Sequence, residues 1–228
     1  MRKHFATLCA TALVMACAAG LQAKEKSIEE KTGLCFGIGA VGGIFNSSSE
    51  MKLTTSLQEK KSDLGLTGGH GGICLMAGHM FEEGFLIGVS MDAMWGSAKG
   101  NYRDTEFAIR DIKLEAKDSY GADLCFGYRI GKSLPHLKVG VVTTKFDSKF
   151  NTETDADAVG SGSESKHKAA FRLGIGGKHC VSDNVAVGLS YDYAWYPKIS
   201  YKTNGASPDT VRIEPRASTF KAHVAFML

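Results

Sequence analysis

The last ten residues of the chain alternate strictly between apolar side chains and smaller or more polar ones, and this period constrains the fold more than any other feature. Lys221 and His223 belong to the polar set. The apolar set is Phe220, Ala222, Val224, Phe226 and Leu228. Successive side chains of a β-strand point to opposite faces. A period of two therefore predicts a strand that separates an apolar environment from a polar one.

The same alternation recurs along most of the chain. Seven further segments show it, namely 33–44, 69–81, 85–96, 112–130, 137–142, 171–178 and 187–195. Together with 219–228 they predict eight strands. Each has one apolar face, and the other face is rich in glycine and charge. A transmembrane barrel has this pattern because its wall meets lipid on one side and a lumen on the other.

The connections between these strands alternate in length. Three are short, at 82–84, 131–135 and 182–184. Four are long and polar, at 46–67, 97–111, 147–168 and 196–216. Outer-membrane barrels have an even strand count, short periplasmic turns and longer outer loops. The sequence therefore predicts an all-β, eight-stranded, antiparallel up-and-down barrel with four long outer loops.

The first part of the chain has the features of an export signal. A basic start precedes the uncharged, alanine-rich run 5–18, which is shorter than the ~20 apolar residues of a spanning helix. We predict a signal peptide, 1–23, cleaved at Ala23, and a barrel domain over 24–228. A lipoprotein signal that ends before Cys17 is the alternative.

The overall charge excludes one class of partner. The chain has 27 Lys and Arg against 24 Asp and Glu, and cleavage of the signal would remove Arg2 and Lys3. The remaining charge is almost balanced, so we expect no nucleic-acid partner.

Two segments carry a family resemblance, Phe171–Gly177 (FRLGIGG) and Asp183–Tyr193 (DNVAVGLSYDY), together with the closing strand. The mature chain resembles the small outer-membrane β-barrels: the OmpA transmembrane domain, OmpX and the opacity-type surface proteins. The resemblance implies a location in the outer membrane of a Gram-negative-type bacterium. Such barrels usually end in Phe or Trp, which the barrel-assembly machinery reads. Here Leu228 is last and Phe226 precedes it by two, and we assign both to the assembly signal.

The two faces predict two groups of residues. Aromatic side chains at both interfaces would form membrane girdles, and they are Phe81, Phe85, Phe126 and Tyr128 near the short turns and Trp95, Tyr193 and Trp195 near the long loops. His79 and His179 share the lipid-facing register and would substitute for girdle aromatics.

The polar face would line the lumen with Asp92, Asp123, Arg129, Lys138, Arg172, Lys178, Asp192, Lys221 and His223. Buried charges must pair or hold water, so we predict a plugged lumen with a hydrated ion-pair network.

The function expected from this architecture is that of a non-enzymatic surface protein, serving envelope integrity, adhesion or host contact through its loops. Its partners would be outer-membrane lipid, lipopolysaccharide, the barrel-assembly machinery and a host-cell receptor. A small porin-like channel and a lipid-modifying outer-membrane enzyme are the alternatives. A soluble, lipocalin-like barrel would place the apolar face inside, and the aromatic girdles disfavour it.

Two features have competing interpretations. Residues 37–42 spell G-x-G-x-x-G, but no helical pattern follows, so we interpret the glycines as part of a strand and not as a nucleotide site. Four cysteines of the barrel domain, Cys35, Cys74, Cys125 and Cys180, share the inward parity. Free thiols are the favoured interpretation and a cross-lumen disulfide is the alternative. No residue spacing indicates a metal or cofactor.

Overall fold

The computed structural model describes residues 32–54, 59–103, 109–152, 161–202 and 210–227. The elements in these ranges are β1 (Gly33–Thr54), β2 (Glu59–Met80), β3 (Phe85–Arg103), β4 (Ile109–Tyr128), β5 (Ser133–Thr152), β6 (Ser161–Cys180), β7 (Val185–Trp195), β8 (Ile199–Lys202) and β9 (Thr210–Met227). None of the described residues forms a helix that is long and apolar enough to cross a membrane.

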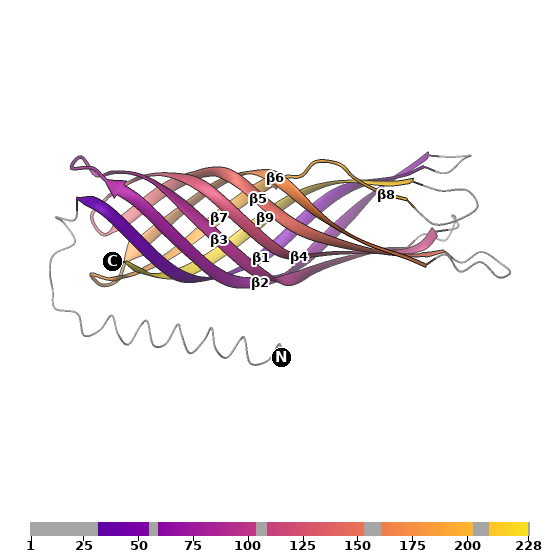
Figure 1. Ribbon diagram of the computed structural model, residues 1–228, viewed down its shortest axis with the longest axis horizontal. Coiled ribbons are helices and arrows are strands. Elements are labelled where there is room, and N and C mark those ends of the chain that lie inside the picture. The colour runs from indigo at the N-terminus through magenta and orange to yellow at the C-terminus, as the bar shows by residue number, and fades with distance from the viewer. Residues whose placement is uncertain (1–31, 55–58, 104–108, 153–160, 203–209, 228) are drawn as a thin grey trace, which may run out of the picture.

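The strands close into a ring of eight (Figure 1). Consecutive strands from β1 to β7 pair antiparallel, and β9 pairs with both β7 and β1. The closing ladder sets Gly39 opposite Ala225. The short strand β8 lies outside the ring order and pairs with the outer part of β9. The predicted up-and-down barrel is confirmed, and the predicted eighth strand is β9.

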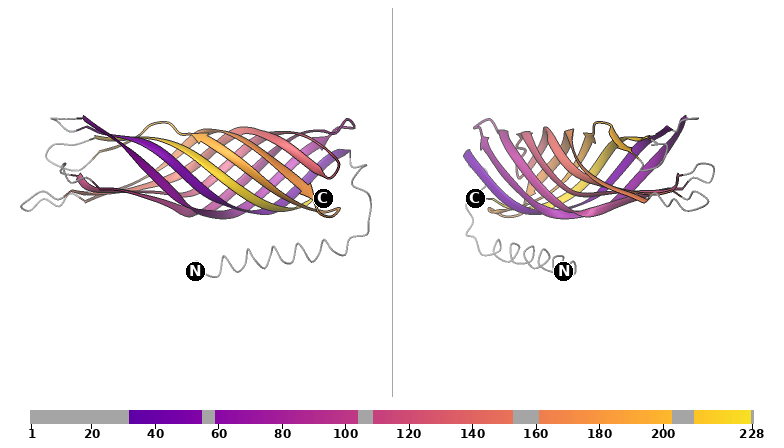
Figure 2. Two further views of the ribbon diagram at one scale, coloured as in Figure 1. Left: turned by 180° about the vertical axis from the view of Figure 1, so that it is seen from behind. Right: turned by 45° about the vertical axis from the view of Figure 1, so that its right-hand side comes forward.

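All three short turns lie at one end of the barrel, together with the end of β9 (Figure 2). Gly84 has φ +89° in the turn after β2, a conformation that favours glycine. The turn after β4 is closed by two hydrogen bonds between Ile130 and Ser133. At the third turn, the Met227 amide donates to the Asn184 carbonyl at 2.6 Å, which ties the end of β9 to this rim.

The predicted long loops are wrong for most of their length. β1 continues to Thr54 and β2 begins at Glu59, so nearly all of 46–67 is strand. The other three predicted loops likewise contain long strand segments. The remainder of the four connections, 55–58, 104–108, 153–160 and 203–209, lies outside the described residues, as do 1–31 and Leu228.

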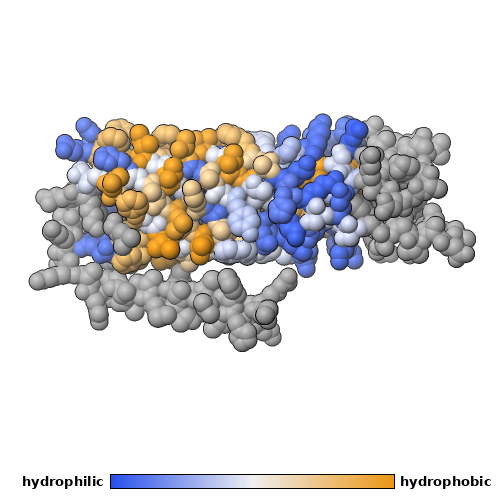
Figure 3. All heavy atoms as spheres, in the orientation of Figure 1, coloured by the Kyte–Doolittle hydropathy of each residue, from blue (hydrophilic) through white to orange (hydrophobic). Residues whose placement is uncertain are grey.

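The polarity of the wall reverses along its length, and this reversal explains the error. Towards the short turns, large apolar side chains such as Ile38 and Leu124 face outward. We call the described parts of 45–69, 97–118, 142–170 and 196–218 the outer extension. Where its side chains are described, polar ones face outward (Figure 3). The apolar ones face inward. We call the rest of the barrel the membrane wall. The alternation of side chains persists throughout the strands. The outer extension is so rich in polar residues, however, that its sequence resembles that of a loop.

The inside of the outer extension is a packed apolar core. Phe146 and Tyr196 meet edge to face, with ring centroids 5.1 Å apart. The buried apolar residues that fill this space are Phe45, Met51, Leu64, Leu66, Ala98, Ile112, Leu114, Ala116, Val142, Phe146, Ala170, Ala194, Tyr196, Ile199, Tyr201, Val211, Ile213 and Ala217. The short strand β8 contributes two of them, which explains why a strand outside the ring folds against β9.

A β-bulge in β4 keeps this core continuous. The pairing of β4 with β5 shifts between Ala116 and Ser119, so one extra residue is accommodated there. As a result Leu114 and Ala116 face inward, and so does Asp123 further along the strand. Simple alternation backward from Asp123 would have turned Leu114 and Ala116 outward. Bulges of this kind re-aim side chains where a wall changes its environment.

Candidate functional site

Six charged side chains from six strands meet in the lumen of the membrane wall, and we call them the charge network. Its acidic members are Asp92 on β3, Asp123 on β4 and Asp192 on β7. Its basic members are Lys138 on β5, Arg172 on β6 and Lys221 on β9. The strand register brings them to one level, because Asp123 and Arg172 both lie opposite Gly140.

Arg172 is the centre of the network. Its Nε donates to Asp123 Oδ1 at 2.9 Å, and its Nη2 donates to Asp123 Oδ2 at 2.5 Å. The same Nη2 donates to Asp92 Oδ1 at 2.7 Å. A planar guanidinium can serve two carboxylates in this way, whereas an ammonium group lacks the fork geometry.

Two lysines complete the network. Lys221 Nζ lies 3.3 Å from Asp92 Oδ2 and 2.9 Å from Asp192 Oδ2. Lys138 Nζ lies 2.7 Å from Asp192 Oδ1. Both ammonium groups contact Asp192 as ion pairs and not as aligned hydrogen bonds. Charges therefore alternate in a continuous path, three of each sign, and their burial is compensated within the lumen.

Glycines on the inner face make room for these side chains. A Cβ on Gly121 would overlap the guanidinium of Arg172, and a Cβ on Gly174 would overlap the carboxylate of Asp192. Any larger residue at either position would displace a charged group from its partner. The glycine-rich inner face is thus a requirement of the charge network.

Small cavities flank the network on both sides. The cavity towards the outer extension has a volume of about 20 Å³ and reaches Phe45, His70 and Tyr196. The cavity towards the short turns has a volume of about 40 Å³, and we call it the inner cavity. Each has room for at most a few water molecules. Above the outer one, the core of the extension fills the lumen.

The structure does not bring all nine predicted lumen residues together. Six form the charge network, and Lys178 and His223 line the inner cavity beside it. Arg129 follows the end of β4, where its backbone N–H donates to the Gly84 carbonyl at 2.8 Å. Its place at the short-turn rim, past the last ladder pair of β4, separates it from the network.

Several polar residues of the lumen were not among those predicted from the sequence to form its polar network. Ser90 and Ser190 lie between the charges, and Lys138 Nζ donates to Ser190 Oγ at 3.4 Å. His136 is buried on β5, and its Nδ1 lies 3.2 Å from the Leu134 carbonyl oxygen. All three share the inward parity of a predicted charge two positions away, and this parity is the signal that could have identified them.

The four cysteines of the barrel are free thiols in the structure. Cys125 is buried, and its thiol donates to Ser90 Oγ at 3.3 Å. Cys35, Cys74 and Cys180 are partly buried. Among the described residues, His, Cys, Asp and Glu form no group of three or more that could hold a metal ion.

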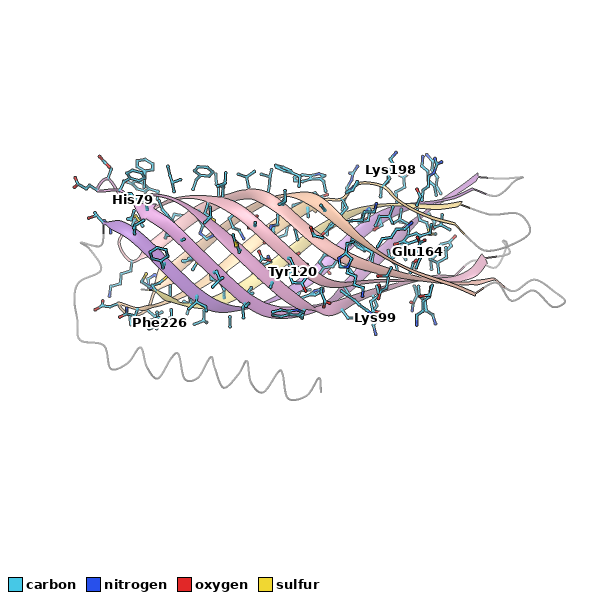
Figure 4. All side chains as sticks on the ribbon, in the orientation of Figure 1. His79, Lys99, Tyr120, Glu164, Lys198 and Phe226 are labelled. Atoms are coloured by element: carbon cyan, nitrogen blue, oxygen red, sulfur yellow. The ribbon has the colours of Figure 1, made fainter. Side chains whose placement is uncertain are left out.

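The predicted girdle residues lie on the outer surface. At the short-turn end, Phe85 and Tyr128 contact each other with centroids 4.9 Å apart. His79 packs on Phe81 in the same region, with ring centroids 4.7 Å apart (Figure 4). The second group is Trp95, Tyr193 and Trp195, and it lies at the boundary between membrane wall and outer extension instead of at the loops. Phe226, the described part of the predicted assembly signal, lies near the short-turn rim (Figure 4).

The comparison with protein families is decisive for the class of protein. The profile of the family described as "Outer membrane protein beta-barrel domain" matches residues 9–226. The chain belongs to this family. No curated protein matches the chain in sequence.

Among solved structures that are similar to this chain, the outer-membrane protein OprG shares its fold. OprG from Pseudomonas aeruginosa is 14% identical with a TM-score of 0.60, over 88% of this chain and 99% of OprG. Ail from Yersinia pestis, in complex with a heparin analogue, is 13% identical with a TM-score of 0.40, over 83% of this chain and 99% of Ail. The protease OmpT from Escherichia coli is 9% identical with a TM-score of 0.44, over 90% of this chain and 99% of OmpT. At 14% identity, the likeness to OprG concerns the fold alone.

Proposed function

We propose that this outer-membrane barrel is a non-enzymatic surface protein that makes adhesive or host contacts through its outer extension. The membrane wall serves as the anchor, and the extension is the part that reaches beyond the lipid. The proposal includes export by the signal peptide 1–23 and assembly by the barrel-assembly machinery through Phe226 and Leu228.

The reversal of polarity is the observation that carries the proposal. A chain that only needed to stay in the membrane would have no use for strands beyond the apolar wall. Here the strands continue, bury Leu64, Leu66 and Phe146 inside, and present charged side chains outside. A rigid sheet with its own core holds a binding surface in place at a fixed height above the membrane.

The outer face of the extension carries ordered rows of charge. Lys61, Lys52 and Arg212 lie directly opposite one another across β2, β1 and β9. The adjacent row across the same strands is acidic and consists of Asp63, Glu50 and Glu214. Like charges placed directly opposite each other weaken strand pairing. An ion pair between the rows offsets part of this effect, since Lys61 Nζ lies 3.8 Å from Glu50 Oε1. Each row still presents several charges of one sign on the outer face, which suits contact with a charged partner.

The lipid contacts follow from the membrane wall. Its outward side chains are large and apolar, as expected of a surface that faces acyl chains. At the outer boundary, Arg216 lies directly opposite Trp195. We propose that Arg216 contacts the phosphate groups of lipopolysaccharide there, because an interfacial aromatic and a cation suit the headgroup region.

The two alternatives find less support in the geometry. A porin-like channel would need a continuous water path, but the core of the outer extension lies above the charge network. The charge network is neutral in sum and its members are engaged with one another. We propose no catalytic role for it.

Reversal of the basic row tests the proposal. We expect the combined variant Lys52→Glu, Lys61→Glu and Arg212→Glu to fold and to lose host-cell binding several-fold, measured with the barrel in lipid nanodiscs. Glu82→Lys with Glu83→Lys is the matched control, because it alters charge at the short-turn rim. Equal binding by wild type, variant and control would disprove adhesion through this face.

A further inference from the structure

The inner cavity contains a positive charge that the charge network does not balance. Lys178 lines it together with Lys138, Lys221 and Asp92. Lys138 and Lys221 are already paired with network carboxylates. Asp92, also engaged by Arg172, is the single carboxylate among the described residues lining this cavity.

The ammonium group of Lys178 is buried, although the residue as a whole keeps some exposed surface. Its Nζ contacts the sulfur of Met76, which carries no charge, and the thiols of Cys74 and Cys125 line the same cavity. An ammonium group in a medium of low dielectric needs a counter-charge or must lose its proton. A negative charge beside Lys178 would therefore be stabilised.

The strand register shapes a recess around this group. Lys178 and His223 both lie opposite Gly188, so no side chain separates them. One step along, His136 and Ser190 both lie opposite Gly176. A Cβ on Gly188 would overlap the His223 ring, and a Cβ on Gly176 would come within 2.8 Å of His136 Nε2. The two glycines therefore make room for the His223 and His136 rings on the inner face.

Two further polar groups line this recess. His223 Nε2 is buried and has no hydrogen-bond partner in the structure. Ser190 Oγ accepts from Lys138, so its own proton is free to be donated elsewhere. With Lys178, the Ser190 hydroxyl and His223 in its Nε2–H tautomer would provide one full positive charge and two further donors. This is the donor set of an anion site.

We propose that the inner cavity binds one halide-sized anion between the Lys178 ammonium, the Nε2–H of His223 and the Ser190 hydroxyl. The volume of about 40 Å³ sets the size limit. A single water needs roughly 10–15 Å³ of such space, so one chloride or bromide ion fits. The site is independent of the outer extension and of its contacts.

Bromide diffraction tests the site directly. Crystals of the folded protein grown with bromide should show an anomalous peak beside Lys178 Nζ. We expect no such peak in Lys178→Met crystals and an unchanged peak in Lys132→Met, which alters an exposed lysine of the turn after β4. Wild-type crystals that contain only water in the inner cavity would overturn the proposal, and this measurement does not depend on the folding of any variant.

A solution measurement separates a functional site from one filled only at high crystal concentrations. At constant pH and ionic strength, replacement of chloride by gluconate should lower the urea midpoint of wild-type unfolding in detergent, because a ligand bound only to the native state stabilises it. Bromide should restore the midpoint. Lys178→Met and Lys178→Gln should show no dependence on the anion. Equal midpoints of wild type in chloride and gluconate would also refute anion binding.

Discussion

Arg172 shows how one residue can set the organisation of a lumen. Its guanidinium neutralises two carboxylates from neighbouring strands, and a glycine on β4 leaves space for it. Lysine in its place could not make the paired contact with Asp123, because an ammonium group has no planar fork. The choice of arginine at this position is therefore explained by geometry as well as by charge.

Replacement of Arg172 alone should destabilise the barrel more than replacement of Arg172 together with its partners Asp92 and Asp123. We expect Arg172→Met to destabilise the barrel by about 3–5 kcal/mol, because Asp92 and Asp123 would stay buried without a partner. Urea unfolding in detergent micelles measures this change. Addition of Asp92→Asn and Asp123→Asn to Arg172→Met should recover most of the loss. A triple variant as unstable as the single one would contradict the charge-pairing explanation.

At the scale of an element, β4 joins the two halves of the molecule. Its bulge brings Lys117 to the outer surface, where Lys117 Nζ lies 2.7 Å from Asp147 Oδ2 and 3.6 Å from Glu115 Oε2. Inside, the Lys117 carbonyl oxygen lies 3.0 Å from His70 Nε2. The bulge thus connects the surface of the outer extension with the top of the lumen.

The carboxylates around the bulge predict a pH dependence. Burial acts to raise the pKa of Asp147, but hydrogen bonds from Lys117 and Ser165 outweigh it, so the pKa lies below the usual value of 3.8. For Glu115, burial is likewise outweighed by the hydrogen bond from Ser97 and the charge of Lys117, so its pKa lies below the usual 4.5. Groups with a lowered folded pKa stabilise the protein above their usual pKa and lose this effect as the pH falls towards the folded value.

We therefore expect the outer extension to loosen as the pH falls below the usual pKa values of these carboxylates. Amide hydrogen exchange in β4 and β5, corrected for its intrinsic pH dependence, measures the loosening. Lys117→Met should reduce the pH dependence, and Lys113→Met, which alters an outward lysine of the same strand, should leave it unchanged. Identical profiles for wild type and Lys117→Met would show that the ion pairs contribute nothing.

At the scale of the whole molecule, the barrel consists of two segments, the membrane wall and the outer extension. The polarity of their inner and outer faces is opposite. The membrane wall holds charge inside and apolar surface outside, as lipid requires. The outer extension holds apolar side chains inside and charge outside, as water requires. The join is marked by the bulge in β4 and by the aromatic group at Trp195.

This arrangement predicts a closed lumen. The folded monomer in planar bilayers should give no large, stable channels, because the core around Phe146 and the charge network both obstruct the path. The combined variant Phe146→Ala and Tyr196→Ala should show more frequent small conductance events, since it thins the apolar core. Large and steady currents from the wild-type protein would argue for the channel alternative.

The sequence alone determined the strands of the membrane wall, their order, the three short turns and the inward position of the charges. Each of these follows from a period of two, because a strand exposes alternate side chains to opposite faces whatever its neighbours are. The inward position of the four cysteines followed from the same parity, and free thiols were the favoured interpretation. The lack of a helical pattern indicated that residues 37–42 form a strand.

Only the tertiary structure decided where the strands end and which charges meet. The polar segments became strands because ring closure gives their alternate apolar residues, such as Leu66 and Ile213, a common interior to fill. Arg172 reaches Asp92 and Asp123, while Lys178 is left beside Met76, because the stagger between strands sets the level of each side chain. Alternation specifies a face, but the depth of a residue within a barrel depends on the register of all eight strands.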